Sequence, residues 1–352
     1  MRGLKKIKQR FTGRKWRKFK SLKRGYYSFI IIILCYLLSF ACPLFIGNDA
    51  LVIKYEHEYY FPVFRYYPAS VFGLNEHGET NYRNLKKAFL VQDNGNFVIM
   101  PFYEYGPNEN LLKELRETPP THPTSANWMG TDDRGRDVFA RIAYGFNISI
   151  SFAATVTIFA YFFGIMIGAV SGYFGGKTDI TVQRLIEIWA TLPFLYIVII
   201  VSSIIVPSFK SLTIIMILFN WVGITFYVRG EVLREKSKDY TSAALAAGAP
   251  AVRILFRHIL PNSLTPVITF IPFAIVANIG SLVALDFLGF GLPPPTPSWG
   301  QLIQQGVFAS MIDKWWLVVF PLTAQFITLL LIVFIGESVR EAFDPKPYSR
   351  LK

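Results

Sequence analysis

Residues 239–262 read DYTSAALAAGAPAVRILFRHILPN, a polar island between two long apolar runs. As far as Gly248 the segment has little side-chain bulk, so the surface of another protein could approach its backbone closely. Glycine can adopt the left-handed conformation that ends a helix, and Pro250 suits the first turn of a following helix. The stretch therefore predicts two short helices joined at a glycine. Such an element, with both ends leading into membrane spans, is typical of a docking site and not of a catalytic site.

The second predicted helix is amphipathic. Its apolar residues recur at helical spacing and are expected to share one face, from which two arginines are turned away. The apolar set comprises Val252, Leu255, Phe256 and Ile259, and the arginines are Arg253 and Arg257.

Several apolar runs approach the roughly 20 residues that a membrane span requires, and hydrophobic residues make up 52% of the chain. Backbone inside a bilayer must satisfy its own hydrogen bonds, so these spans are expected to be helices. The fold class is therefore an all-α integral membrane protein with about six transmembrane helices. The predicted spans are residues 28–46, 147–170, 185–206, 211–228, 264–288 and 315–335. The prolines expected to kink them are Pro193, Pro266, Pro272 and Pro321.

The chain carries a formal net charge of +13, and most of this excess lies in one tail. Residues 2–24 contain 12 Lys and Arg residues and no acidic residue. A basic tail beside an apolar span typically fixes topology by the positive-inside rule, so we expect no nucleic-acid binding. Residues 47–144 hold 10 basic and 13 acidic residues, whereas residues 229–258 hold six and three. We therefore expect both termini and the 239–262 stretch in the cytoplasm, with residues 47–127 outside.

The external insert, residues 47–127, is rich in aromatic residues and has strand-like apolar runs at 51–55 and 97–105. Two interpretations stay open. The aromatics could form the core of a small lid domain or rest at the membrane interface, or they could form a surface that meets a substrate-delivery protein. Residues 118–125 are a linker by composition, so the insert is expected to be removable without disturbing the spans.

Candidate catalytic and ligand-binding motifs fail on their spacing. Residues 175–178 read GGKT, but Ser171 stands where a phosphate-binding loop requires glycine, so a tight turn is expected instead. No Ser/His/Asp or Cys/His set can be assembled on one side of the membrane. The histidines, which lack metal-ligand spacing, are His57, His77, His122 and His258. We expect no catalytic residue, no metal and no cofactor.

Acidic residues near the membrane are expected to have structural roles. Asp132, Asp133 and Asp137 lack the spacing of a calcium loop, and Asp132 is expected to cap an amphipathic helix over residues 134–144.

Charges within the predicted spans are few. Arg184 and Glu187 lie three residues apart and can pair on a helix surface, and Asp286 lies at the outer end of span five. A proton-driven carrier usually needs a buried chain of carboxylates, so their scarcity argues against a secondary transporter.

Ala243, Ala244, Gly248 and residues 259–261 resemble the EAA loop of ABC-importer permeases. In that family the loop is a coupling helix that sits in a cleft of the ATP-binding subunit. The glutamate that names the motif is Ser242 here, which removes any salt bridge of that glutamate but leaves the small-residue packing.

Two further segments resemble the oligopeptide/dipeptide branch of this family. Residues 130–137 read GTDDRGRD, and residues 287–300 read FLGFGLPPPTPSWG, so that the resemblance covers roughly residues 128–345. Residues 51–55, 60–62, 94–95 and 334–345 are similar to the narrower Yej-type branch.

The resemblance implies the permease subunit of an ATP-driven importer in a bacterial inner membrane, for peptides or peptide-like compounds. It implies a second permease subunit in a heterodimer, two cytoplasmic ATP-binding subunits and an external solute-binding protein, with ATP hydrolysis on a partner. The residues implied in coupling to the ATPase are Tyr240, Ala243, Ala244, Ala247, Gly248, Ala249 and Arg253. No substrate-binding residue follows from the sequence.

On this reading the chain has four parts. They are a basic cytoplasmic tail (1–27), a first transmembrane helix (28–46), a periplasmic insert (47–127) and a permease core (128–352) with five transmembrane helices and the coupling loop 239–262. The alternatives are a permease of the same superfamily for another solute, such as nickel or glutathione, a secondary transporter, or a membrane enzyme.

Overall fold

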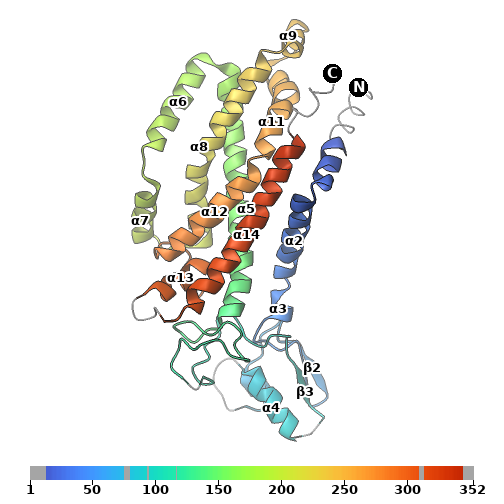
Figure 1. The fold of residues 1–352 in the computed structure, drawn as a ribbon, viewed down its shortest axis with the longest axis vertical. Coiled ribbons are helices and arrows are strands. Elements are labelled where there is room, and N and C mark those ends of the chain that lie inside the picture. Colours follow the sequence, from blue (N-terminus) through green and yellow to red (C-terminus); the bar gives the residue numbers. More distant parts are fainter. Residues whose placement is uncertain (1–12, 75–79, 93–94, 116, 309–312, 344–352) are drawn as a thin grey trace.

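In a computed structural model, the described residues are 13–74, 80–92, 95–115, 117–308 and 313–343. Long helices run side by side along an elongated molecule, and the insert with α4 and the strands stands at one end (Figure 1). The short helix α9 lies at the opposite end (Figure 1). Residues 1–12 of the predicted basic tail and residues 344–352 lie outside the described part of the chain.

Among the described residues, three helices are each long and apolar enough to cross a membrane: α5 (Val138–Phe174), α8 (Phe209–Lys236) and α14 (Trp316–Phe343). Three bent pairs pass the same test together. They are Gly13–Ser21 with α2 (Lys23–Ser39), α6 (Gly176–Ala190) with α7 (Phe194–Ile204), and Ala251–Ile268 with α12 (Ile271–Phe287). The described part of the chain therefore has up to six spans, as predicted, when each bent pair counts as one crossing.

The prediction that four prolines kink the spans is only partly right. The third span breaks by 71° where Pro193 precedes α7, and the fifth bends by 56° just before Pro272, in the first turn of α12. Pro321 lies inside the continuous helix α14, and Pro266 lies inside α11 (Leu260–Ile268). A proline fits best at the start of a helix, where its missing N–H would have no helical partner. Pro193 and Pro272 both stand at the start of the helix that follows the break.

Glycines on one face of α5 bring it into close contact with α8. A Cβ atom on Gly168 would lie 2.6 Å from the carbonyl oxygen of Thr225, and one on Gly172 would lie 2.8 Å from that of Arg229. The Thr225 hydroxyl also donates to the Gly164 carbonyl oxygen across the interface, at 3.2 Å. Small residues four apart are a known way for membrane helices to approach, so this seam positions the two central spans.

Replacing Gly168 with alanine is expected to destabilise the fold by about 1–3 kcal/mol, because the new methyl group must push α8 away. The matched control is Gly280→Ala in α12, where an added Cβ meets no atom within 4 Å. That change should be neutral or slightly stabilising, since alanine favours helix more than glycine does. Thermal unfolding in detergent measures both, and equal melting temperatures would refute the close α5–α8 seam.

The first and last spans also pack together. A Cβ on Gly25 in α2 would clash with the side chain of Ser338 in α14, and Lys18 Nζ donates to the Glu341 carbonyl oxygen at 2.6 Å. The described ends of the chain therefore meet at the end of the molecule where α9 lies (Figure 1).

The insert has a small core of its own. Strands β2 (Glu58–Tyr60), β1 (Val52–Tyr55) and β3 (Phe97–Ile99) form an antiparallel sheet in that order, in which Ile53 pairs with Tyr60 and Val98. The predicted strand-like runs are thus confirmed in part. Helix α4 (Tyr82–Gln92) and the short η1 (Ala69–Phe72), which the sequence did not suggest, cover the sheet. The buried apolar residues here are Ala50, Ile53, Phe72, Tyr82, Leu85, Phe89, Val98 and Met100.

The aromatic residues of the insert divide between this core and the surface. Tyr55, Tyr60 and Tyr67 pack against the core, whereas the rings of Phe64 and Tyr66 are 80% and 64% exposed. Both interpretations of the aromatics therefore stay open.

The segment 118–125 is not a free linker, contrary to the prediction from composition. Thr121 is buried, its N–H donates to Thr131 Oγ1 at 2.9 Å, and its carbonyl accepts from the Thr131 N–H at 3.0 Å. The core satisfies these backbone groups, so the segment is held at Thr121 although Thr118, His122, Thr124 and Ser125 are exposed.

Candidate coupling site

Helix α9 (Asp239–Ala246) ends as the sequence predicts. Gly248 has φ of +75°, the Gly248 N–H donates to the Leu245 carbonyl, and the Ala249 N–H donates to the Ala244 carbonyl. This pair of bonds is the Schellman arrangement, which leaves glycine as the least strained residue at its left-handed position. Ala244 and Ala249 also pack against the apolar cluster beneath, as residues flanking this motif commonly do.

A buried glutamate ties α9 to the end of α8. Glu235 is 4% exposed, and its carboxylate accepts from the Tyr240 hydroxyl at 2.6 Å and from Lys238 Nζ at 2.5 Å. Its carbonyl oxygen accepts from the Thr241 hydroxyl at 3.0 Å. Burial and the bond to Glu235 raise the pKa of Tyr240. The sequence analysis missed Glu235, which anchors this turn although Ser242 replaces the glutamate of the EAA pattern.

The predicted face of the second helix is confirmed in part, since Leu255 and Ile259 are buried and the two arginines are exposed. After α10 (Ala251–Arg253) the chain forms a π-helical segment, η2 (Ile254–Ile259), in which Ile254, Leu255 and Ile259 are buried. Val252 and Phe256, expected on the buried face, are 64% and 40% exposed. The wider π turn changes which residues share a face, so a 3.6-residue pattern misplaces them. Pro250 lies just before α10 as its N-cap and not within its first turn.

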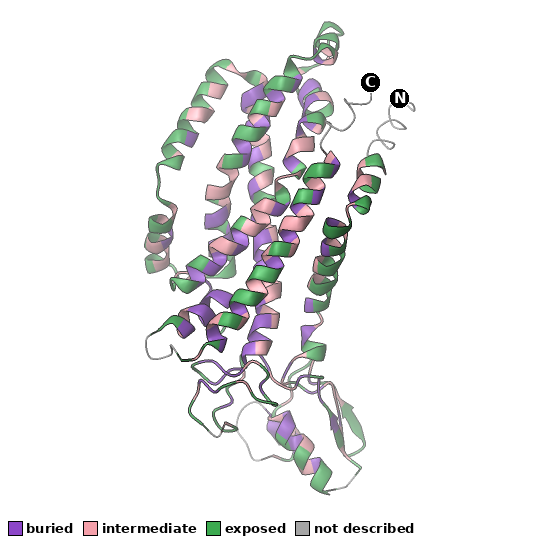
Figure 2. Cartoon of the chain, viewed as in Figure 1, coloured by how far each residue is buried: buried purple, intermediate pink, exposed green. Residues whose placement is uncertain are grey.

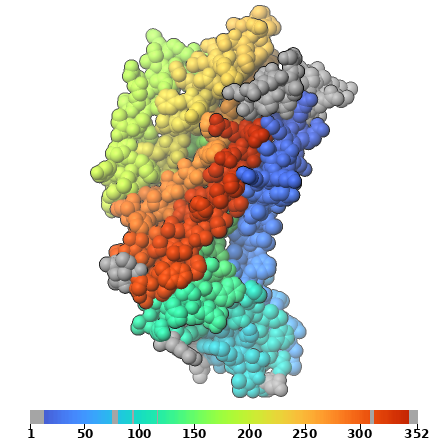
Figure 3. Space-filling model, in the orientation of Figure 1, coloured from blue at the N-terminus to red at the C-terminus, as the bar shows by residue number. Residues whose placement is uncertain are grey.

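The residues implied in coupling lie together on this short element. Exposed members are Ala243, Ala247, Gly248 and Arg253, while Tyr240, Ala244 and Ala249 are half-buried. The structure adds three exposed apolar side chains that sequence reasoning did not assign to the site, namely Leu245, Val252 and Phe256. We call these three the coupling patch. Its segment forms the far tip of the molecule, opposite the insert (Figures 1 and 3).

Replacing Tyr240 with phenylalanine removes one of the bonds that fix α9 to α8. We expect a loss of about 1 kcal/mol in stability, the usual contribution of one hydrogen bond. Because α9 would then move more freely against α8, transport per ATP hydrolysed should fall more than ATP hydrolysis itself. Both rates can be measured in the reconstituted importer that the sequence resemblance implies, and an unchanged ratio would show that the Tyr240–Glu235 bond has no part in coupling.

The remaining motifs have structural roles. Gly175 and Gly176, with φ of +64° and +52°, form the turn between α5 and α6 that was predicted for GGKT. Arg184 and Glu187 form the expected ion pair at 2.6 Å on an exposed helix face. Among the described residues no group of three or more His, Cys, Asp or Glu could hold a metal ion, and His77 lies outside them.

Asp137, and not Asp132, caps the helix that follows it, which corrects the prediction. The helix α5 begins at Val138, and Asp137 Oδ1 accepts from the Ala140 N–H at 2.8 Å. Asp132 instead binds Arg136, with Nε to Oδ2 at 2.7 Å. Either aspartate could act as a helix N-cap by residue type, and the sequence does not distinguish which one stands at the helix boundary.

Asp137 also joins the insert to the core. Its Oδ2 accepts from the Tyr103 hydroxyl at 2.6 Å and from Asn127 Nδ2 at 2.8 Å. Burial raises the pKa of Asp137, against the lowering effect of these hydrogen bonds. Arg141, fully buried one turn on, donates to the carbonyl oxygens of Pro107 in the insert and Thr296 before α13 (Trp299–Val307).

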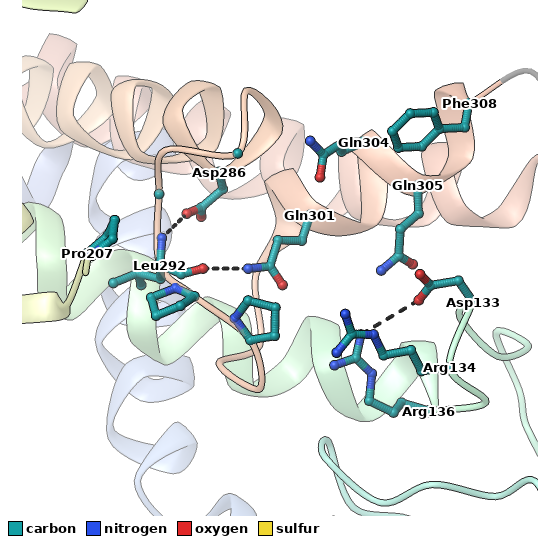
Figure 4. A pocket seen from close by; sticks show the side chains of 14 residues that line it. Asp133, Arg134, Arg136, Pro207, Asp286, Leu292, Gln301, Gln304, Gln305 and Phe308 are labelled. Atoms are coloured by element: carbon teal, nitrogen blue, oxygen red, sulfur yellow. Dashed lines mark hydrogen bonds and ion pairs between the residues drawn. The ribbon is translucent and has the colours of Figure 1, made fainter. Parts of the chain in front are cut away.

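A pocket of about 340 Å³ lies at the insert end of the bundle, beside Asp286 (Figure 4). Asp286 accepts from the Leu292 N–H and the Ser298 hydroxyl, and Gln301 Nε2 donates to the Leu292 carbonyl. Residues 287–300, with the sequence FLGFGLPPPTPSWG, therefore form a loop that these hydrogen bonds hold around Asp286. Gln305 and Arg134 face the open part of the pocket (Figure 4).

Comparisons with known proteins agree with the helical membrane fold. A family profile described as "Binding-protein-dependent transport system inner membrane component" matches residues 164–347. The chain is 39% identical to the Peptidoglycan transport system permease protein YejE of Agrobacterium fabrum, covering 95% of this chain and 93% of the relative. It is 37% identical to the Inner membrane ABC transporter permease protein YejE of Escherichia coli, covering 94% and 96%. It is 34% identical to the Dipeptide transport system permease protein DppC of Bacillus subtilis, covering 71% and 77%.

The helices and these similarities define a multi-pass permease of an inner membrane. The chain belongs to the family of binding-protein-dependent transport system inner membrane components, and its relatives include Yej-type and dipeptide permeases, as the sequence resemblance implied. Members are translocation subunits of ABC importers, which work with ATP-binding and solute-binding partners.

Proposed function

We propose that this chain, together with a second and different permease subunit, forms the membrane pathway of an importer for peptides or peptide-like compounds. The names of its relatives support the substrate class, since they include peptidoglycan, dipeptide and oligopeptide transport permeases. The chain itself contributes no ATP hydrolysis. Movement of the ATP-binding subunits drives α9 and η2, and through them switches the spans between outward and inward access.

The observation that carries the coupling role is the coupling patch. Leu245 and Val252 are apolar and more than half exposed, they lie on either side of the turn at Gly248, and the exposed Arg253 follows Val252. An apolar centre with a charged rim is typical of a surface that binds another protein. The Glu235 bonds fix α9 to α8, and the Schellman turn orders the end of α9, so force applied there is transmitted to a central span.

Leu245→Asp tests this docking role. We expect the variant to insert normally but to lose most of its co-purification with the ATP-binding subunit, because a charge replaces an apolar contact. The matched control is Leu90→Asp on α4, an equally exposed leucine, 75% against 66%, at the other end of the molecule. If Leu245→Asp retains the ATP-binding subunit as well as the control does, the patch is not the docking surface.

The orientation can be tested separately. The charge distribution supports cytoplasmic termini and an external insert. In a background lacking Cys35 and Cys42, a cysteine at the exposed Phe102 should react with a membrane-impermeant thiol reagent in spheroplasts. One at the exposed Ser237 should react only after the membrane is opened. The reverse pattern would overturn this topology.

The substrate class is tested by competition. Uptake of a labelled short peptide by the reconstituted importer should be reduced by unlabelled peptides and unaffected by nickel ions or glutathione. Competition by nickel or glutathione alone would assign the importer to another solute.

A further inference from the structure

A short basic helix precedes the first span and turns sharply away from it. Residues Gly13–Ser21 form this helix, which we call the N-terminal helix, and it is bent by 97° from α2. Because α2 belongs to the first span, the N-terminal helix runs roughly parallel to the membrane surface. It lies at the end of the molecule where α9 also lies (Figure 1). A helix in this orientation commonly binds the membrane surface through an apolar face and flanking basic residues.

One face of the N-terminal helix is aromatic and contacts the span. Phe19 is 5% exposed, and its ring lies 5.5 Å from that of Trp16 and 6.0 Å from that of Phe29 in α2. Trp16 is also 6.3 Å from Phe29, although 47% of Trp16 is exposed. Tryptophan is typical of the level of the lipid headgroups. Further along α2, the exposed apolar side chains are Ile30, Ile31, Ile33, Leu34, Leu37 and Leu38. The aromatic face therefore continues into a surface suited to lipid.

A second face holds the N-terminal helix against the end of α14. Lys18 Nζ donates to the Glu341 carbonyl oxygen at 2.6 Å, and Lys15 Nζ lies 4.4 Å from the centre of the Phe343 ring. Cations are favourable at the C-terminal end of a helix, where carbonyl oxygens lack helical partners. These two contacts fix the orientation of the N-terminal helix, so its remaining charges project in a defined direction.

The remaining face carries cations that the protein does not neutralise. Residues 13–24 contain seven Lys and Arg residues and no acidic residue, and the next acidic residue along the chain is Asp49. Lys20 lies over the exposed Trp16 ring, 5.5 Å from its centre, so charge and aromatic surface adjoin. Like charges gathered on one side repel each other, and an anionic partner relieves this repulsion. The exposed cations that form no ion pair within the described part of the chain are Arg17, Lys20, Lys23 and Arg24.

We propose that the N-terminal helix and the first turn of α2 bind the phosphate groups of anionic lipids in the adjacent membrane leaflet. The aromatic face lies among the lipids at the interface, and the exposed cations contact their phosphates. Lipid suits this surface better than an acidic protein does, because the cations adjoin an aromatic face that leads along α2 into the bilayer. Lipid bound here would also strengthen the contact of the first span with the last, through Lys15 and Lys18. The inference goes beyond the proposed transport function and is independent of the solute.

The test follows the melting temperature of the full-length protein in a neutral detergent while phosphatidylglycerol is titrated into the micelles. Phosphatidylglycerol should stabilise the wild type. Phosphatidylcholine, whose headgroup has no net charge, and soluble glycerol 3-phosphate should not. The variant combines Lys20→Gln, Lys23→Gln and Arg24→Gln. It should require more than about tenfold more phosphatidylglycerol for half of the stabilisation, because each basic side chain near anionic lipid strengthens binding about fivefold.

The matched control also removes two lysines and one arginine, but from the insert at the other end of the molecule. It combines Arg65→Gln, Lys87→Gln and Lys113→Gln, all at exposed positions, and should respond to phosphatidylglycerol as the wild type does. If the two triple variants respond equally, or if phosphatidylglycerol does not stabilise the wild type, the lipid site is refuted. Equal stabilisation by glycerol 3-phosphate alone would indicate a site for a free anion instead.

Ionic strength provides a second measurement on the wild type, should the triple variant accumulate poorly. Added sodium chloride should weaken the stabilisation by phosphatidylglycerol, since salt screens exposed charges. Stabilisation that is unchanged at high salt would overturn the proposal. So would loss of the co-purified ATP-binding subunit from the triple variant with an unchanged response to lipid, because the cations would then contact a protein partner.

Discussion

Gly248→Asp should abolish most transport while the protein still inserts and folds. Gly248 has φ of +75°, which costs a non-glycine residue about 1 kcal/mol, and an added Cβ meets no atom of the chain within 4 Å. The folded subunit therefore tolerates the side chain. Its position beside the coupling patch means that the carboxylate would project into the proposed contact with the ATP-binding subunit. We expect transport to fall by at least about tenfold, since a buried unpaired charge costs several kcal/mol.

Gly95→Asp is the matched control for this prediction. Gly95 in the insert has φ of +71° and equally open surroundings, so its backbone cost is the same. Transport and co-purified ATP-binding subunit should be close to wild type for Gly95→Asp and strongly reduced for Gly248→Asp, at equal abundance in the membrane. Equal transport by the two variants would show that α9 is not in contact with a partner.

The sequence predicted the spans because a bilayer imposes a simple requirement, namely enough apolar residues in a helical backbone. The break before α7 was also predictable, since Pro193 lies within an apolar run that it must interrupt. The first and last residues of the helices were less predictable. Helix α5 begins at Val138, nine residues before the predicted start at 147, because its first turns are packed against the insert and not against lipid.

The coupling element shows what local patterns do not encode. The helix end at Gly248 was predicted correctly because it depends only on backbone conformation. The buried face of η2 was only partly right, with Leu255 and Ile259 buried but Phe256 exposed, because nothing in the residue types marks a π turn. Glu235 was missed because its partners, Tyr240 and Thr241, reach it only after the chain turns between α8 and α9.

The polar contact between α5 and α12 was beyond prediction for a related reason. Asn278 and Thr157 are 121 positions apart in sequence and lie on different spans, so only packing brings them together. Neither residue is charged, so neither attracts notice as an intramembrane ion would.

Asp137→Ala should destabilise the protein more than any other substitution considered at the insert boundary. The carboxylate accepts three hydrogen bonds, from Ala140 N–H, the Tyr103 hydroxyl and Asn127 Nδ2, and it is fully buried. Alanine would leave all three donors without this partner and remove the cap of α5. We expect a loss of about 3–5 kcal/mol, seen as a lower melting temperature in detergent and less protein in the membrane.

Asp133→Ala is the control, because Asp133 is partly exposed and lies 3.8 Å from Arg136 in a weak ion pair. Its loss should cost less than about 1 kcal/mol.

The insert also stabilises the start of α5. Tyr103 reaches Asp137 from the insert and Pro107 accepts from Arg141, so the insert helps to hold the start of α5. Deleting residues 47–127 should therefore lower stability at least as much as Asp137→Ala does. A deletion variant as stable as wild type would show instead that the insert folds as an independent lid.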